Sequence, residues 1–146
     1  MRVMRSLLAG ALLAPVMAFA ADSPVGLWKT IDDKTGQPTA YIRIADVNGE
    51  LQGKIEKLVR PADQNPNPLC VKCEGANKNQ PLIGMTILSG LKPEGDSYTG
   101  GQILDPGNGT LYKAKMSLAD NGRKLEVRGY IGVPMLGRSQ VWVREQ

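Results

Sequence analysis

The chain has 146 residues, with 18 Lys and Arg, 14 Asp and Glu, two Cys and no His. This length accommodates one compact domain, and the lack of His excludes Ser-His-Asp and Cys-His catalysis as well as His-ligated metal or haem sites. Without the two arginines of the leader described next, 16 basic residues face 14 acidic ones. A net charge of +2 is too small to predict binding to nucleic acid.

The N-terminus has the three-part pattern of a secretory leader. Arg2 and Arg5 precede the almost wholly apolar segment 7–20, which ends in Ala18-Phe19-Ala20, the small-x-small form that signal peptidase accepts. The apolar segment is too short to span a hydrocarbon core of ~30 Å comfortably, which disfavours a retained membrane anchor.

We therefore expect residues 1–20 to be a signal peptide that is removed after Ala20. The remaining chain, residues 21–146, contains no later apolar segment long enough to cross a membrane. The leader predicts a bacterial protein that is exported to the periplasm.

The rest of the chain consists of short segments with alternating apolar and polar residues, separated by Gly, Asn, Asp and Pro. This is the pattern of β-strands joined by turns. Asn48-Gly49 is typical of a hairpin turn, because both residues readily take positive φ. The pattern predicts eight strands, at 24–31, 39–46, 50–59, 82–91, 97–104, 110–118, 123–131 and 138–145.

Half-apolar strands need a second layer to cover their apolar face, and the sequence has no helix of normal length to supply it. The sheet must therefore fold onto itself as a barrel or a sandwich, and a barrel also removes exposed edges. Glycines inside the predicted strands, such as Gly53 and Gly129, fit the bends of a strongly curved sheet. The sequence predicts an all-β domain over 21–146, with about eight antiparallel strands in an up-and-down barrel.

One segment, 60–81, interrupts this regular spacing with several prolines and both cysteines. It is long for a structureless loop. It either contains a short helix, around 74–79, or forms an ordered flap.

Cys70 and Cys73 are expected to form a structural disulfide, because the predicted compartment is oxidising. A redox-active pair would lie at the start of a helix after a strand, whereas a proline-rich loop precedes this pair. A metal site would need two more ligands, and the chain has no His and no other Cys. We expect no metal and no cofactor; a thiol–disulfide redox protein using these cysteines stays open as an alternative.

The first and last predicted strands carry Trp28 and Arg144. In a meander barrel, a Trp on the first strand commonly plugs one end of the barrel beneath an Arg. We expect Trp28 to be structural, with Arg144 or Arg138 over its ring in a cation–π contact. The alternative is that Trp28 stacks on a ligand.

The segment 128–138 holds the candidate ligand-binding residues Arg128, Tyr130, Met135 and Arg138. A guanidinium in the barrel mouth suits a carboxylate or phosphate, which it binds bidentately. The alternative is that these arginines are exposed and their stems cover apolar surface. Met135 and its neighbour Leu136 form either an exposed tip that contacts a partner or membrane, or a cap over the barrel.

These features together resemble a bacterial family of small exported proteins known as domain of unknown function 2147. The resemblance covers essentially all of residues 21–146. It implies a lipocalin-like small barrel, and it brings no established activity or catalytic residues. It rests on the leader, Gly26-Leu27-Trp28, Asp105-Pro106, Tyr112 and the motif Leu125-Glu126-Val127-Arg128-Gly129-Tyr130…Gly137-Arg138-Ser139-Gln140-x-Trp142-x-Arg144.

An eight-stranded barrel has room for packed side chains or for one small ligand. The first interpretation is a non-catalytic binding module for a small apolar or amphipathic ligand with a negative end, entering between 60–81 and 130–138. The second is a filled barrel that acts as a protein-partner or envelope-interaction module. The third is an enzyme, either a redox protein using Cys70 and Cys73 or a carboxylate-dependent hydrolase.

Overall fold

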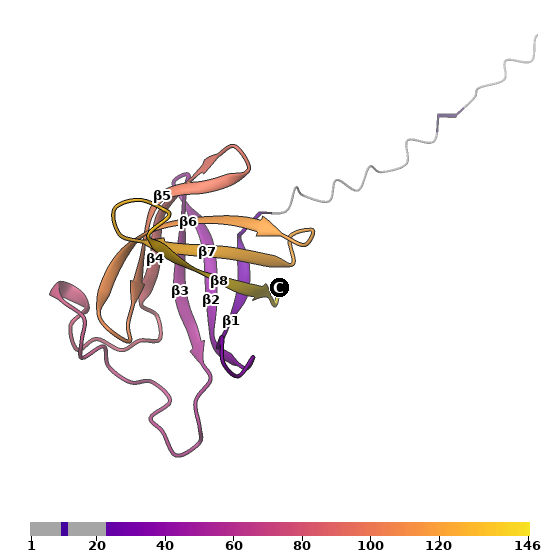
Figure 1. Cartoon of the computed structure of the whole chain (residues 1–146). Coiled ribbons are helices and arrows are strands. Elements are labelled where there is room, and N and C mark those ends of the chain that lie inside the picture. Colours follow the sequence, from indigo (N-terminus) through magenta and orange to yellow (C-terminus); the bar gives the residue numbers. More distant parts are fainter. Residues whose placement is uncertain (1–9, 12–22) are drawn as a thin grey trace, which may run out of the picture.

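The computed structural model describes residues 10–11 and 23–146 (Figure 1). Apart from the dipeptide 10–11, the predicted signal peptide and its cleavage site after Ala20 lie outside the described residues. Within the part of the chain that is described, no helix has the length and apolarity needed to cross a membrane.

The described residues form eight antiparallel strands that close into one barrel. Each strand pairs with the next one along the chain, and the last strand pairs with the first, so the connectivity is up and down. The predicted all-β class and closed meander are confirmed. The strands are β1 (Gly26–Ile31), β2 (Pro38–Val47), β3 (Glu50–Leu58), β4 (Thr86–Glu94), β5 (Ser97–Asp105), β6 (Thr110–Ala119), β7 (Lys124–Tyr130) and β8 (Gly137–Arg144).

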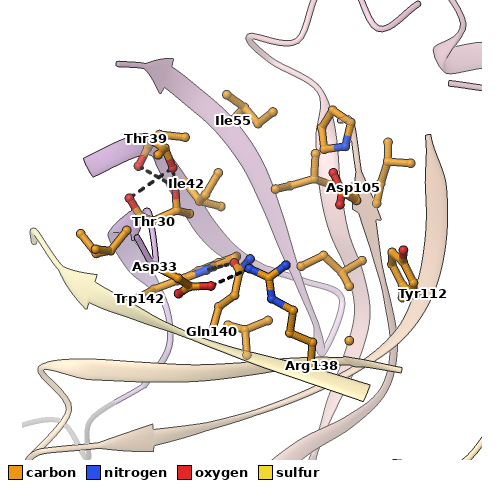
Figure 2. Close-up of a pocket in the computed structure, with 18 of the residues that line it drawn as sticks. Thr30, Asp33, Thr39, Ile42, Ile55, Asp105, Tyr112, Arg138, Gln140 and Trp142 are labelled. Carbon is orange, nitrogen blue, oxygen red and sulfur yellow. Dashed lines mark hydrogen bonds and ion pairs between the residues drawn. The ribbon is translucent and has the colours of Figure 1, made fainter. Parts of the chain in front are cut away.

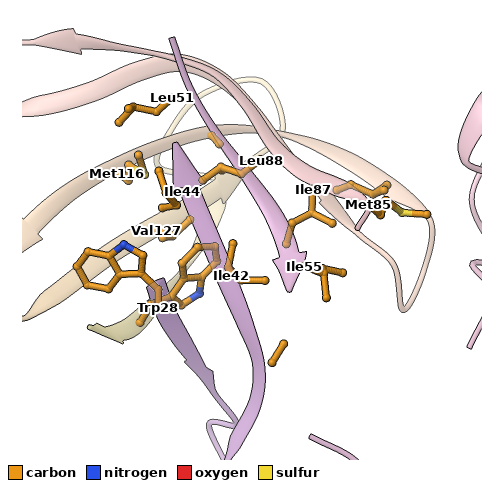
Figure 3. Packing of buried hydrophobic residues seen from close by; sticks show 14 of the residues in the cluster. Trp28, Ile42, Ile44, Leu51, Ile55, Met85, Ile87, Leu88, Met116 and Val127 are labelled. Carbon is orange, nitrogen blue, oxygen red and sulfur yellow. The ribbon is translucent and has the colours of Figure 1, made fainter. Parts of the chain in front are cut away.

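The alternation of each strand decides which side chains enter the barrel. In β2, Ala40, Ile42 and Ile44 are buried, whereas Arg43 and Ala45 are exposed. The period of two puts successive residues on opposite faces of the sheet. Figure 3 shows the inward-facing residues of several strands meeting in one apolar cluster, which includes Trp28, Ile42, Ile44, Leu51, Ile55, Leu88, Met116 and Val127.

The fourth strand begins at Thr86 and ends at Glu94, later than the predicted 82–91. Residues 82–85 form a turn instead, in which the Met85 amide donates to the Leu82 carbonyl at 3.0 Å and Gly84 has φ of +91°. The apolar run alone does not show where a turn interrupts it. The strand also continues through Pro93, which a sheet tolerates where no amide donor is needed.

The connection between β3 and β4 is held together by backbone hydrogen bonds. The amide of Cys70 donates to the Gln80 carbonyl, and the amide of Asn79 donates to the Cys70 carbonyl, each at 2.8 Å. The expected short helix is a single turn of 3₁₀-helix, η1 (Gly75–Asn77). The connection is therefore an ordered loop outside the barrel that contains little helix.

Trp28 fills one end of the barrel, here called the closed end. Its side chain is fully buried, and its indole Nε1 donates to the Pro24 carbonyl at 2.7 Å. The Arg144 guanidinium lies 4.3 Å from the centroid of the Trp28 ring. Of the two arginines considered from the sequence, Arg144 makes this contact, and Arg138 lies at the other end of β8.

The same arginine closes the seam between the first and last strands. The β1–β8 register has two Cα pairs, Trp28 with Arg144 and Lys29 with Val143. Arg144 adds hydrogen bonds from its guanidinium to the carbonyls of Val25 at 3.1 Å and Gly122 at 2.7 Å. One charged side chain thus joins the stacked ring, the chain before β1 and the β6–β7 turn.

Replacing Trp28 by Ala should lower the free energy of unfolding by about 3–5 kcal/mol, because it leaves a cavity that the rigid barrel end cannot refill. Urea unfolding followed by circular dichroism measures the change. Lys29→Ala, on the opposite face of the same strand, is the control and should cost less than about 1 kcal/mol. Equal losses for the two variants would contradict the role given to Trp28.

Candidate functional site

The up-and-down topology divides the strand connections between the two ends of the barrel. The closed end, beside Trp28, has three short turns. The other end, here called the open end, carries both connections that the sequence marked as irregular. Its four connections are 32–37, 59–85, 106–109 and 131–136.

A cavity of about 620 Å³ extends from the barrel interior to the open end. Residues of all four open-end connections line it, among them Asp33, Leu82, Pro106 and Leu136. This volume lies within the range of small-molecule sites, roughly 300–1,000 Å³. The barrel is therefore not packed solid with side chains.

The deep walls of the cavity are apolar. They are formed by inward-facing residues of five strands: Ile42, Ile55, Ile87, Ile103 and Val127. Strand alternation explains Ile42, Ile55 and Val127, whereas Ile87 and Ile103 each have a buried neighbour in the same strand, Leu88 and Leu104. Such walls favour an apolar body, because they offer dispersion contacts and no hydrogen-bond partner.

Polar groups lie along one side of the cavity, mostly on β1, β2 and β8 (Figure 2). The hydroxyls of Thr30 and Thr39 are 2.6 Å apart. On β8, the Trp142 indole donates to the Gln140 side-chain oxygen at 3.2 Å. These groups can fix the orientation of a ligand whose apolar part fills the deeper space.

Arg138 and Asp33 form an ion pair at the open end, on the side where β8 adjoins β1, with Nη2 and Oδ2 2.5 Å apart (Figure 2). Both side chains are exposed, and both residues line the cavity. The positive charge of Arg138 at the mouth is therefore compensated by the Asp33 carboxylate. The expectation that this arginine attracts a negative ligand end is weakened, since an anion must first displace Asp33.

Two further aspartates that line the cavity accept hydrogen bonds from backbone amides of the turns in which they lie. Asp32 Oδ1 accepts hydrogen bonds from the amides of Lys34 and Thr35, each at 2.8 Å. The bonds from the Thr35 and Lys34 amides hold the pKa of this carboxyl below its ordinary value, against a small opposing effect of desolvation. Asp105 Oδ1 likewise accepts the Gly107 amide at 2.8 Å.

The predicted ligand-binding residues are divided by the structure. Tyr130 and Arg138 line the cavity. Met135 does not, and 85% of it is exposed. Arg128 lies on the outer face, where its guanidinium donates to the Pro134 carbonyl at 2.6 Å and to the Ser139 hydroxyl at 2.9 Å.

The segment 60–81 does not line the cavity, contrary to the expectation from the sequence; of the described residues around it, only its flanks Leu58 and Leu82 do so. Asp33, Thr30 and Gln140 also line the cavity and were not among the binding residues predicted from the sequence. For Gln140 the alternation of β8 could have indicated its direction, because it shares a face with Arg138 and Trp142.

Residues 70–73, here called the disulfide segment, pack against the cavity mouth from outside the barrel. Cys70 and Cys73 are bonded to each other, and both are buried. Cys70 Sγ lies 3.8 Å from the Pro106 carbonyl oxygen, and the Lys72 carbonyl packs so closely on Gly109 that a Cβ there would clash. The disulfide segment therefore packs against the 106–109 turn, and a second cavity of about 430 Å³ lies between them.

Nothing in the described part of the chain gathers three or more His, Cys, Asp or Glu side chains in a way that could hold a metal ion. The chemistry available in the cavity is apolar contact, hydrogen bonding and one compensated ion pair.

The comparisons place this barrel among known proteins. A family model described as an uncharacterized protein conserved in bacteria (DUF2147) matches residues 26–144, which is the whole barrel from β1 to β8. The resemblance seen in the sequence is confirmed. No curated protein matches the sequence.

A solved structure, protein HP1028 from the human pathogen Helicobacter pylori, is described as belonging to the lipocalin family. It superposes with a TM-score of 0.70 and 18% sequence identity, over 85% of this chain and 84% of that chain. At this identity the similarity shows the fold, and the barrel is lipocalin-like.

Replacing both cysteines, as Cys70→Ser with Cys73→Ser, should loosen the 106–109 turn without unfolding the barrel. The bonded ring is tiny, so it contributes less than the ~3 kcal/mol expected for a 15-residue loop. Hydrogen exchange should become faster at Gly107 and Gly109 and stay unchanged in the β2 amides. Global unfolding of the double variant would show that the barrel depends on this disulfide.

The Asp32 carboxyl should titrate below the ordinary aspartate value of 3.8 in an NMR pH series. Its contribution to stability is present above that value and is lost as the pH falls through the lower pKa of the folded state. The amide shifts of Lys34 and Thr35 should follow the same curve. A titration at or above 3.8 would contradict the turn geometry described for Asp32.

Proposed function

The chain belongs to the bacterial DUF2147 family, and from this premise we propose that it is a non-catalytic protein that binds one small apolar or amphipathic ligand inside its barrel. The observation that carries the proposal is the cavity of about 620 Å³, with apolar walls and a mouth at the open end. A lipocalin-like fold supports the same conclusion, since eight strands leave room for one small ligand. The leader pattern and the bacterial family favour a periplasmic location.

The ligand is expected to place an apolar body against Ile42, Ile55 and Ile103 and a polar end at the mouth. An uncharged polar end suits the mouth best, because it leaves the ion pair between Asp33 and Arg138 in place. A carboxylate end would have to replace Asp33 as the partner of the guanidinium. Hydrogen-bonding groups at Thr39 and Gln140 supply orientation without requiring charge.

The redox alternative is less well supported by the surroundings of the cysteines. Both are buried, and the only helical turn that follows them, Gly75–Asn77, begins after Cys73 and has three residues. A reactive cysteine usually lies exposed at a helix N-terminus, where its thiolate is stabilised. The structural role of Cys70 and Cys73 is therefore the one we propose.

Filling part of the cavity should weaken binding while leaving the barrel folded. Ala40 lines the cavity, and Ala45 lies exposed on the other face of the same strand. Ala40→Phe should weaken binding of the neutral probe Nile red by about tenfold or more, equal to about 1.4 kcal/mol. Ala45→Phe, with the same added volume, should bind as the unchanged protein does.

Fluorescence titration measures both affinities, and thermal unfolding checks that each variant is folded. Equal affinities for Ala40→Phe and Ala45→Phe would place the probe outside the barrel and overturn the proposal. Native mass spectrometry of protein purified from its own cells should in addition find a retained small molecule.

A further inference from the structure

The link between β7 and β8 exposes an unusually apolar surface. Each of its six residues, 131–136, is apolar, Gly or Pro. The exposed fractions of Ile131, Val133, Met135 and Leu136 are 62%, 50%, 85% and 72%. These four residues are called the apolar tip. Single exposed apolar residues are ordinary, but a contiguous group at a functional mouth marks a contact surface.

The apolar tip is held outward by hydrogen bonds. The Leu136 amide donates to the Val133 carbonyl at 3.0 Å, and the Arg128 guanidinium donates to the Pro134 carbonyl at 2.6 Å. A tip that capped the barrel would bury these side chains, which the structure does not do. The link is thus built to present apolar groups to its surroundings.

The apolar tip is continuous with the cavity. Ile131 and Leu136 belong to the exposed tip and also line the cavity mouth. An apolar molecule can therefore pass from a surface in contact with Met135 into the barrel along apolar side chains. The continuity favours a partner that is itself apolar at the point of contact.

Cations lie beside the apolar tip on the outer face of the barrel. Lys115 on β6 lies opposite Arg128 on β7, and Lys113 lies opposite Tyr130 at the start of the link. Among the described residues, none of these three cations takes part in an ion pair. Two like charges opposite each other repel, and an anionic surface beside them relieves that cost.

Among the remaining charges around the link, Asp105 at the start of the 106–109 turn is negative, and the others nearly cancel. In the neighbouring β1–β2 turn, Asp32 and Asp33 are balanced by Lys34 and by Arg138, which pairs with Asp33. Glu126 also shares the outer face of β7, at a position further from the link than Arg128. The surroundings of the apolar tip are therefore basic on the β6–β7 side.

We propose that the open end docks on a lipid bilayer with anionic headgroups, with the apolar tip inserted at the interface. Apolar side chains would enter the boundary between headgroups and acyl chains, and Lys113, Lys115 and Arg128 would face the lipid phosphates. The docking brings the cavity mouth against the membrane, so that an apolar ligand moves between bilayer and barrel without crossing water. Docking itself does not depend on the ligand proposal, because Val133, Met135 and the three cations lie outside the cavity lining.

Vesicle flotation tests this docking on protein purified from cells that express the full chain. Vesicles of phosphatidylethanolamine and phosphatidylglycerol should bind the unchanged protein. The double variant Val133→Ser with Met135→Ser should bind them at least tenfold less, and its Nile red affinity should stay unchanged because neither residue lines the cavity. The matched control, Val25→Ser with Val47→Ser, alters exposed valines at the closed end and should bind vesicles normally.

A second double variant separates the contribution of charge from that of apolar insertion. Lys113→Gln with Lys115→Gln should weaken binding to the phosphatidylglycerol vesicles by about fivefold per charge removed. The unchanged protein should bind uncharged phosphatidylcholine vesicles more weakly than anionic ones, and the double variant should bind the phosphatidylcholine vesicles as the unchanged protein does.

Three outcomes would overturn the proposal. They are no vesicle binding by the unchanged protein, equal binding by the Val133→Ser, Met135→Ser variant, and a self-associating protein whose dimer, rather than vesicle binding, is lost in that variant. Sedimentation velocity detects the dimer. Vesicle binding that fails while Nile red still binds would reject docking alone and leave the ligand-binding proposal standing.

Discussion

The architecture depends on one contact, the stacking of the Arg144 guanidinium on the buried ring of Trp28. A cation over an indole ring contributes about 0.5–2 kcal/mol, and this cation also donates to backbone carbonyls on both sides of the seam. The β1–β8 register is short, with two Cα pairs, and backbone hydrogen bonds between Leu27 and residues 145–146 extend it, so Arg144 adds side-chain contacts to a seam that is also closed by the backbone. Because these residues fill one end, the unfilled space lies toward the other.

The open end combines an apolar interior with a polar mouth. Its deep walls are apolar, whereas its mouth carries the Arg138–Asp33 ion pair and two aspartates that accept backbone amides of their own turns. An exposed ion pair adds little stability, but it removes a free charge from the mouth. The disulfide segment lies outside this mouth and supports the 106–109 turn. The result is a mouth with defined shape and little net attraction for an anion.

The two proposals join these features into one sequence of events. Under these proposals, the apolar tip would bring the open end to a lipid surface, and the cavity would receive a molecule that leaves that surface. The residues divide between the two tasks according to the strand face on which they lie: the inward residues of β2 and β8 line the cavity, whereas the outward residues of β6 and β7 carry the cations. Ile131 and Leu136 belong to both sets, so only changes at residues outside this overlap, such as Val133 and Met135, are expected to affect one task alone.

The alternating pattern by itself determined the strand count, the inward faces and the closed meander, because a period of two and a sheet without a covering helix allow few other solutions. It also pointed to Trp28 and to an arginine of the last strand, although the two candidates, Arg138 and Arg144, lie on the same face and periodicity cannot separate them. Only the tertiary structure decided that Arg144 stacks on the ring, that Arg138 pairs with Asp33, and that 60–81 stays outside the cavity. Each of these depends on which residues of distant segments meet at one end of the barrel, and the size of the cavity depends on how side chains from all eight strands fill a shared space. Local sequence determines the direction of a side chain, but its partner across the barrel is set by strand register and closure.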